Sequence, residues 1–314
     1  MTPPGSLRLD GILQVLRDAD LLLEVRGSED AAVSGVAHDS RRVAEGDLFV
    51  AWAGSTSDGH DFAAAAAARG ASALILERPL EGIELPQAIV RDGRVAAALA
   101  GHWAAGWPGE ELTLVAVTGT NGKTTTAFLA RHLLAGRRPT ASIGTVGVVG
   151  TDGVADPATA ALTTPGPVDF ADTLRDLADA GAEVVVFEAS SHALDQRRFA
   201  GVRVDVAVFT NLSQDHLDYH GDMGAYRAAK LRLVDHLGPG AAAVVNVGDP
   251  AWAGVRGSRT LTFAVEPDAG VAADLVALDV RTERSGTRFT IARGGERRDV
   301  RLPLVGGFSV TIKV

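Results

Sequence analysis

The sequence predicts an α/β protein: a small N-terminal α/β domain, then a central domain with a mainly parallel sheet covered by helices and a β-rich end. Three observations lead to this prediction. Short apolar runs alternate with helical patterns along most of the chain. Runs such as Leu112–Val117 leave no room for polar alternation, as in parallel strands buried on both faces. A glycine-rich loop joins that run to a helical pattern.

The first hundred residues contain the elements of one small domain. Leu7, Leu9, Ile12, Val15 and Leu16 follow a helical period. Further helices are expected at His60–Arg69 and Arg94–Ala105, and strands at Val33–Ala37, Leu48–Trp52, Ala73–Leu76 and Ala88–Val90. The break Gly106–Gly109 predicts a boundary, so the two domains are residues 1–108 and 109–314.

The second domain repeats the alternation and then changes character. After Leu112–Val117 comes a helix to about Leu134. Buried strands are expected at Val184–Phe187, Val204–Phe209 and Ala241–Val247, and helices at Val168–Ala180 and Met223–His236. The β-rich end is expected at Thr260–Phe263, Leu275–Val280, Arg288–Ala292 and Val300–Leu304.

Composition limits the possible functions. The 314 residues carry a net charge of −9, which argues against a nucleic-acid-binding protein but leaves room for a local phosphate site. The absence of cysteine excludes disulfides, thiolate metal sites and a cysteine nucleophile. The N-terminus does not resemble a secretory signal, and no apolar run is long enough to predict membrane insertion. We therefore expect a cytoplasmic monomer. The chain uses arginine almost throughout, and its lysines are Lys123, Lys230 and Lys313.

The segment Gly119–Thr125 lies between a buried strand and a helix and reads Gly-Thr-Asn-Gly-Lys-Thr-Thr. Glycines let backbone N–H groups turn toward one point, and the helix N-terminus adds partial positive charge, so the context suits phosphate. Lys123 would reach the β- and γ-phosphates, and the Thr124 hydroxyl would ligate Mg²⁺. Val117 replaces the first glycine of the full phosphate-loop pattern. The loop predicts nucleotide binding but leaves the reaction open.

Two later strand ends carry polar side chains. Glu188 ends an apolar run and is either a second magnesium anchor or a surface carboxylate. The loop after Phe209 holds His216 and His220 with two aspartates, and is either a metal-binding cluster or a hydrogen-bonded loop. Ligand sites of open α/β sheets gather at such carboxyl ends.

Lys230 lies in a helix that otherwise uses Arg227 and Arg232 as its basic residues. It is either a solvated helix lysine or a residue with chemistry that arginine cannot perform. A buried lysine amine can lose its proton and act as a nucleophile, whereas a guanidinium stays charged.

Taken together, these segments resemble the Mur ligases of peptidoglycan synthesis, and among them most closely the MurE type. The resemblance covers about residues 30 to 305. It rests on Asp39-Ser-Arg41 with Gly46–Ala51, Gly119–Thr125, Thr163–Pro165, Glu188–Leu194, Asn211–Gly221 and Tyr226–Lys230, in the family's order.

The resemblance implies an ATP-dependent amide ligase that adds a diamino acid, meso-diaminopimelate or L-lysine, to UDP-MurNAc-L-Ala-D-Glu through an acyl phosphate. The implied cofactors are ATP, Mg²⁺ and a CO₂-derived carbamate on Lys230. The catalytic residues would be Lys123, Lys230, His216 and Glu188, and the metal ligands Thr124, Glu188, His216 and the carbamylated Lys230. ATP would be bound by Gly119, Thr120, Asn121, Gly122, Lys123, Thr124 and Thr125. The UDP-muramoyl substrate would be bound by Ser40, Ser55, Thr56, Ser57, Thr163, Thr164, Ser190, Gln196 and Arg198.

The chain departs from the family at its end. The family continues for about one more domain, which carries an Asp-Asn-Pro-Arg-type motif that selects the diamino acid. Its Gly-x-Phe-Asn-x-x-Asn segment corresponds to Gly306–Ile312 here, with Ser309 and Ile312 at the asparagine positions. We interpret the tail as a truncation, from a frameshift or a chosen boundary. It would leave part of the central sheet uncovered, which predicts marginal stability and incomplete ligase activity.

Two alternatives remain open. A folylpolyglutamate-synthase-like ligase shares the loop and the carbamylated lysine, but gives no reason for the N-terminal Asp39-Ser-Arg41 segment. A non-catalytic nucleotide- or UDP-sugar-binding remnant would lack substrate-dependent phosphate release.

Overall fold

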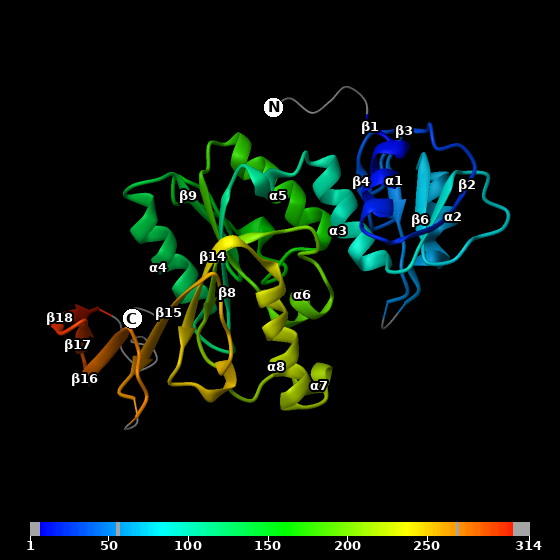
Figure 1. Ribbon diagram of the computed structural model, residues 1–314. Coiled ribbons are helices and arrows are strands. Elements are labelled where there is room, and N and C mark those ends of the chain that lie inside the picture. Colours follow the sequence, from blue (N-terminus) through cyan, green and yellow to red (C-terminus); the bar gives the residue numbers. More distant parts are fainter. Residues whose placement is uncertain (1–6, 55–56, 268–269, 304–314) are drawn as a thin grey trace. The chain divides into compact units, whose positions relative to one another are not determined.

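The computed structural model of the chain describes residues 7–54, 57–267 and 270–303 (Figure 1). Its contacts divide the chain into two units. The first unit comprises Met1–Pro108, Pro165–Asp176 and Gln196–Gly201, and the remainder forms the second. The first division follows Pro108, inside the predicted Gly106–Gly109 break, whereas nothing in the linear order of elements predicted the two later returns to the first unit.

The first unit is built on a five-stranded sheet of order β2-β7-β6-β5-β4. Its parallel strands are β4 (Val36–Ala37), β5 (Leu48–Val50), β6 (Ala73–Leu76) and β7 (Gln87–Val90), and β2 (Leu22–Arg26) runs antiparallel to β7. Because the four parallel strands point the same way, the segments that follow them meet at one edge of the sheet.

Helices cover both faces of this sheet. Helices α1 (Leu9–Asp18) and α3 (Gly93–Ala104) share one apolar core, and α2 (Ala63–Ala68) packs into the core on the other face. The prediction of one strand at Val33–Ala37 is wrong. The segment forms two short strands, β3 (Ala32–Val33) and β4, and β3 pairs with β1 (Leu7–Arg8). The chain turns between them, where Ser34 N donates to Gly46 O at 2.9 Å.

The second unit is built on an eleven-stranded sheet of order β11-β10-β9-β12-β8-β13-β14-β15-β16-β17-β18. The strands from β9 to β16 in this order are parallel, and both edges are antiparallel. The central strands are β8 (Thr113–Thr118), β9 (Thr140–Gly144), β12 (Val184–Glu188), β13 (Val204–Phe209), β14 (Leu237–Asn246), β15 (Arg259–Val265) and β16 (Leu275–Glu283). The edge strands are β10 (Gly147–Val149), β11 (Ala155–Asp156), β17 (Gly286–Arg293) and β18 (Glu296–Leu302).

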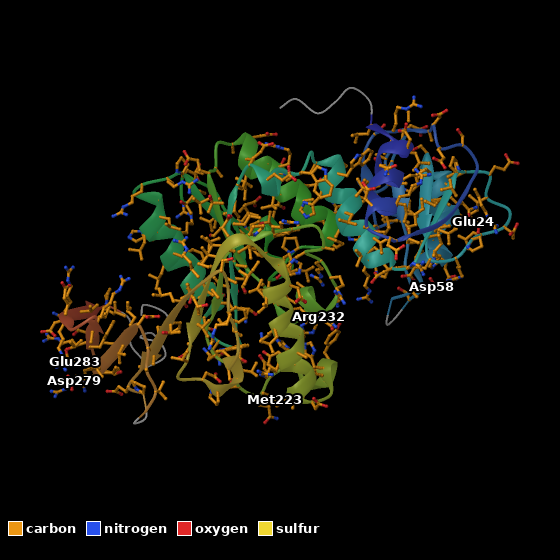
Figure 2. All side chains as sticks on the ribbon, viewed as in Figure 1. Glu24, Asp58, Met223, Arg232, Asp279 and Glu283 are labelled. Carbon is orange, nitrogen blue, oxygen red and sulfur yellow. The ribbon has the colours of Figure 1, made fainter. Side chains whose placement is uncertain are left out.

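Helices follow several of these strands. They are α4 (Lys123–Ala135), α6 (Ser191–Asp195), α7 (Leu217–His220) and α8 (Met223–Leu231), whereas most of α5 (Pro167–Asp179) belongs to the first unit. The predicted helix Met223–His236 tightens into a 3₁₀ turn at Arg232–His236; Figure 2 labels Met223 and Arg232 at the two ends of α8. The predicted α/β class with a β-rich end is confirmed.

Strand β9 was not predicted, and its composition explains why. Its sequence is Thr-Ala-Ser-Ile-Gly, yet all five residues are buried between β12 and β10. Its hydroxyl-bearing and glycine residues lower the apolar signal without preventing burial. A strand of this kind is recognised only when its neighbours are known.

Val206, Val208 and Val244 lie on the α4 face of β13 and β14, and all three are only partly buried. The uncovered sheet and the marginal stability expected from the sequence both stay predictions. The tail from Gly306, with Lys313, lies outside the described residues. No described helix has the length and apolar character needed to cross a membrane.

Candidate active site

The glycine-rich loop leaves the centre of the large sheet, because β8 pairs with β12 on one side and β13 on the other. Gly119 has φ +147°, and a Cβ there would lie 1.9 Å from Thr210 Oγ1. Gly122, at φ +86°, precedes the first residue of α4. Both positions therefore require glycine, and the loop turns tightly into the helix as predicted.

The loop is fixed by the segment that follows β13. Thr120 N donates to Asn211 O at 2.7 Å, and Asn121 N donates to Asn211 Oδ1 at 3.1 Å. Thr210 Oγ1 donates to Asn121 O at 2.8 Å. These bonds hold the backbone in its curved form without help from a ligand.

Lys123 lies against its own loop. Its Nζ donates to Gly119 O and to Thr120 O, both at 2.9 Å. Burial lowers the pKa of this ammonium group, and the charges of Glu188 and Asp215 oppose the shift. The cation is therefore placed inside the loop, where a phosphate would meet it.

Glu188 is 1% exposed, so its interpretation as a surface carboxylate is wrong. Its Oε2 accepts hydrogen bonds from Thr124 Oγ1 at 2.9 Å and Thr145 Oγ1 at 3.2 Å. Its Oε1 accepts from Thr145 N at 2.8 Å. A buried carboxylate joined to a hydroxyl of the phosphate loop is an all-oxygen donor set, which fits Mg²⁺.

The described residues contain no group of three or more histidine, aspartate or glutamate side chains arranged to hold a metal ion. This does not conflict with the fit, because Mg²⁺ beside a nucleotide uses one or two protein ligands together with phosphates and waters.

Three of the predicted substrate-binding residues gather at the same strand end. Thr164 is 1% exposed, and its Oγ1 donates to Glu188 O at 2.7 Å and lies 3.2 Å from Ser190 Oγ. Thr163 Oγ1 lies 3.3 Å from Thr145 Oγ1. The structure thus links residues 163, 164 and 190 to Glu188 and Thr124.

Lys230 is also 1% exposed, so its interpretation as a solvated helix lysine is wrong. Its Nζ donates to Gly119 O at 2.7 Å, the same carbonyl that accepts from Lys123, and lies 4.6 Å from the Tyr226 ring centre. Burial, with a smaller contribution from the charge of Lys123, lowers the pKa of Lys230 to about 7. Lys123 and Lys230 therefore both donate to the same loop carbonyl, that of Gly119.

His216 lies in a less enclosed place. Its side chain is 45% exposed, its φ is +51°, and its Nε2 lies 3.5 Å from Asp215 Oδ2. Its ring centre is 4.8 Å from that of His192 and 6.1 Å from that of Tyr226. His216 and Lys230 therefore each lie next to the Tyr226 ring.

Thr145 and Tyr226 complete the site and were not among the predicted residues. Thr145 follows β9, the strand that composition concealed, and Tyr226 lies 3.2 Å by its hydroxyl from Thr120 Oγ1. Tyr226 precedes Lys230 by one helical turn, so the helical period could have suggested that both face the loop.

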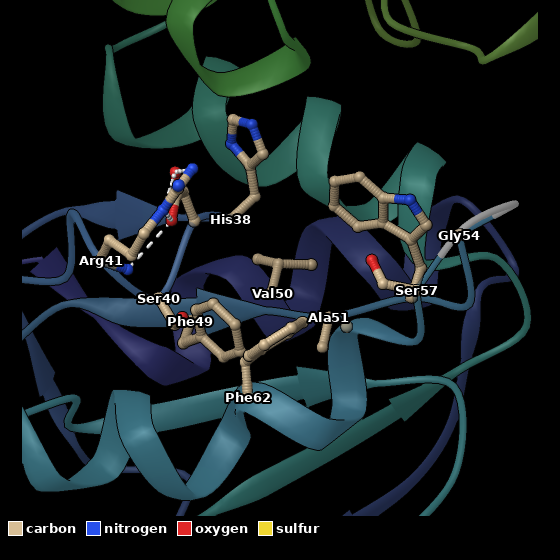
Figure 3. A pocket seen from close by; sticks show the side chains of 12 residues that line it. His38, Ser40, Arg41, Phe49, Val50, Ala51, Gly54, Ser57 and Phe62 are labelled. Atoms are coloured by element: carbon tan, nitrogen blue, oxygen red, sulfur yellow. Dashed lines mark hydrogen bonds and ion pairs between the residues drawn. The ribbon is translucent and has the colours of Figure 1, made fainter.

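A separate cavity lies in the first unit. It has a volume of about 500 Å³ and is lined by residues of the segments that follow β4 and β5, among them His38, Ser40, Trp52 and Ser57. Figure 3 shows Ser40 and Ser57 around it, with Phe49 and Phe62. We call it the N-terminal pocket. Ser55 and Thr56 lie outside the described residues.

Gln196 and Arg198 are held together and do not belong to the described lining of the N-terminal pocket. Arg198 Nη2 donates to Gln196 Oε1 at 2.7 Å, and Arg198 Nη1 donates to Pro165 O at 3.4 Å. Of the predicted substrate residues, the structure therefore places Ser40 and Ser57 at one cavity, residues 163, 164 and 190 beside Glu188, and this pair elsewhere.

The position of Glu188 can be tested through its neighbour Gly144. A Cβ on Gly144 would lie 2.1 Å from Glu188 Oε1 and 2.8 Å from Cδ. We expect Gly144→Ala to push the carboxylate off its threonine partners and lower the free energy of unfolding by about 1–3 kcal/mol. Urea unfolding measures this change.

Gly136→Ala is the matched control for this substitution. Gly136 ends α4 in right-handed helical conformation, and a Cβ there meets nothing within 4 Å. It should be neutral or stabilising by up to about 1 kcal/mol. Equal effects of the two substitutions would show that Glu188 is not held by close packing.

Comparison with known proteins supports a common origin for this arrangement. The Mur ligase middle domain matches residues 117–311, and the domain described as "Mur ligase family, catalytic domain" matches residues 32–106. A UDP-N-acetylmuramoyl-L-alanyl-D-glutamate--2,6-diaminopimelate ligase of Xanthomonas campestris is 43% identical over 93% of this chain and 60% of its own length.

Two solved structures show the same fold. One, of a UDP-N-acetylmuramoyl-L-alanyl-D-glutamate--2,6-diaminopimelate ligase, has a TM-score of 0.80 and 29% identity, and the match covers 98% of this chain and 62% of that one. The other, the MurF ligase from Thermotoga maritima in complex with ADP, has a TM-score of 0.58 and 25% identity over 90% of this chain and 61% of its own. The chain spans about 60% of the length of the curated relative named above. With both of its domains matched, the chain belongs to the Mur ligase family.

Proposed function

We propose that this chain carries the nucleotide- and UDP-substrate-binding parts of an ATP-dependent ligase that joins diaminopimelate to UDP-MurNAc-L-Ala-D-Glu. The observation that carries the proposal is the meeting of Lys123, Lys230 and the Glu188–Thr124 pair at one phosphate loop. Names of relatives support the choice of substrates, and the ADP complex of a related ligase supports nucleotide binding.

In this proposal, residues 119–125 bind ATP, with Lys123 directed at its terminal phosphates. The D-glutamyl carboxylate attacks the γ-phosphorus, the bond to ADP breaks, and an acyl phosphate forms. The amine of the diamino acid then attacks the acyl carbon, phosphate leaves, and the amine loses a proton. Two anions must approach each other in the first step, so positive groups at the loop are needed to offset their repulsion.

Thr124 and Glu188 would hold one Mg²⁺, and His216 with Lys230 a second. When bound, Mg²⁺ supplies charge compensation between the γ-phosphate and the incoming carboxylate. For Lys230 to serve a cation, its own charge must change. The buried amine can add to CO₂, forming an N–C bond and losing a proton, and the resulting carbamate offers anionic oxygens. Its burial beside Lys123 favours the neutral amine that this addition requires.

The N-terminal pocket would bind the UDP part of the substrate, with Ser40 and Ser57 as hydrogen-bonding groups. Ser55 and Thr56 stay predicted contacts of the same substrate. The wall of the pocket contains the stacked rings of His38 and Trp52, whose centres are 5.7 Å apart. Planar aromatic walls with a few hydroxyls suit a uracil base. Thr163, Thr164 and Ser190, and separately Gln196 and Arg198, would contact the muramoyl dipeptide. The substrates imply a cytoplasmic reaction, and we keep the expectation of a monomer.

The test of the function mixes the chain with ATP, Mg²⁺, UDP-MurNAc-L-Ala-D-Glu and meso-diaminopimelate. We expect phosphate release that depends on the UDP substrate, calorimetric binding of both ATP and UDP, and, because ligase activity is predicted to be incomplete, little tripeptide by mass spectrometry. L-Lysine in place of diaminopimelate tests the choice of amine.

The alternatives give different results in the same assay. A folylpolyglutamate-synthase-like enzyme would release phosphate with a folate and glutamate and ignore UDP. A binding remnant would bind ATP and UDP without any substrate-dependent phosphate release. Either result would contradict the proposed ligase activity of this chain.

A further inference from the structure

One wall of the N-terminal pocket follows β5 and consists of two paired segments, residues 52–54 and 57–59, which together we call the hairpin. Trp52, Gly54, Ser57 and Gly59 of this wall line the cavity. Ala53 and Asp58 form an isolated antiparallel bridge. Gly59 N donates to Trp52 O and Gly54 N to Ser57 O, both at 2.9 Å. The hairpin is too short to hold its position in the unit by its own bonds alone.

Glu77 ties this hairpin to the rest of the unit. It immediately follows β6. Its Oε2 accepts from Ala53 N at 3.0 Å, and its Oε1 accepts from Gly93 N, at the start of α3, at 2.9 Å. A single carboxylate therefore joins the segments that follow β5, β6 and β7.

His60 ties the other end of the hairpin. It is 3% exposed, its Nε2 accepts from Glu77 N at 2.9 Å, and its Nδ1 lies 2.5 Å from Asp58 Oδ1. Because Nε2 accepts a backbone N–H, the ring must be neutral with its proton on Nδ1, which donates to Asp58. Asp58, labelled in Figure 2, also pairs with Arg78 at 2.8 Å.

The packing leaves the hairpin little freedom to shift. A Cβ on Gly59 would lie 2.8 Å from Trp52 O, and a Cβ on Gly93 would lie 2.7 Å from Trp52 Cβ. The backbone of Gly59 and Gly93 therefore packs closely against Trp52, and Glu77 Oε1 holds Gly93 N in place. A wall that is fixed before binding lowers the ordering cost that a ligand must overcome.

We propose that Glu77 and His60 are positioning residues that set the affinity of the N-terminal pocket for a nucleoside diphosphate. Neither belongs to the described lining of the cavity. They act through Ala53 and Asp58, at the two ends of the hairpin. The inference rests on the proposed function, in which this pocket binds the UDP part of the substrate.

The experiment measures binding of UDP to the whole chain by calorimetry, and binding of a non-hydrolysable ATP analogue to the same samples. Glu77→Gln keeps the size of the side chain but leaves one of its two N–H donors facing an amide NH₂. His60→Asn can still reach Asp58 but loses the acceptor for Glu77 N. For each we expect UDP binding about tenfold weaker and ATP-analogue binding unchanged.

Glu81→Gln is the control, because Glu81 belongs to the same unit and its side chain is 91% exposed. It should bind UDP as the wild type does. Folded Glu77→Gln and His60→Asn chains with wild-type UDP affinity would overturn the inference, as would equal losses for UDP and the ATP analogue, which would indicate a general structural role. If Glu77→Gln does not fold, His60→Asn decides by the same criteria.

A wild-type chain that binds the ATP analogue but not UDP would instead contradict the proposed substrate of the pocket, and the inference would fall with it. UDP binding by the wild type together with unchanged variants would contradict the positioning role alone. The two failures are therefore distinguishable in one set of titrations.

Discussion

Replacing Lys230 by methionine should strongly slow substrate-dependent phosphate release and, at the same time, make the chain more resistant to heat. The loss of activity follows from the loss of the amine that would become an anionic carbamate. We expect turnover to fall about 10²- to 10³-fold, the range for removing one preorganised electrostatic group. Incubation with isotope-labelled bicarbonate should give a carbamate signal in the wild type that the variant lacks.

The gain in stability follows from burial. The Lys230 side chain is 1% exposed, and its ammonium group is close to that of Lys123, since both donate to Gly119 O. Methionine has a similar shape and no charge to bury. Lys230→Arg is the informative partner variant, because it keeps the charge and cannot form the carbamate. It should lose activity without becoming more stable.

The effect should depend on pH in a defined direction. The pKa of Lys230 falls from an ordinary 10.5 to about 7 in the folded chain. Between these values the unfolded chain binds more protons, so the stability of the wild type rises with pH. The advantage of Lys230→Met is therefore full below about pH 7 and fades toward pH 10.5. Thermal unfolding in magnesium-free, CO₂-depleted buffer at several pH values tests this. An advantage that grew with pH would contradict it.

Replacing Lys123 by alanine should remove most of the affinity for nucleotide. In the structure its Nζ donates to two loop carbonyls, at Gly119 and Thr120, and a bound phosphate would compete for the same protons. A hydrogen bond to a charged group contributes about 1.5–3 kcal/mol, which corresponds to about 10- to 150-fold in the dissociation constant. Calorimetry with a non-hydrolysable ATP analogue measures it.

His132→Ala is the control for this prediction, since His132 is exposed in the last turn of the same helix. It should leave nucleotide affinity unchanged, and both variants should bind UDP normally at the N-terminal pocket. Near wild-type affinity in Lys123→Ala would show that the loop binds phosphate through its backbone alone and that the lysine has another role.

The sequence predicted best those features that depend on residues close together along the chain. The loop Gly119–Thr125 was predicted with its flanking strand and helix, because glycine conformation, strand burial and helix initiation all act within a few residues. The rarity of lysine singled out Lys123 and Lys230, and the structure brings both to Gly119 O. For Glu188 and Lys230, the sequence left a surface interpretation open beside the functional one.

Other features of the site depend on which strands are neighbours in the sheet, so only the tertiary structure shows them. Glu188 became a buried carboxylate because Thr145, at the end of β9, and Thr124, at the start of α4, close over it from separate segments. The contact between Lys230 and Gly119 joins residues 111 positions apart. The Glu77–His60 arrangement likewise joins the ends of adjacent strands. Such contacts are set by sheet order and by the face on which each helix packs, and no short pattern along the chain encodes either one.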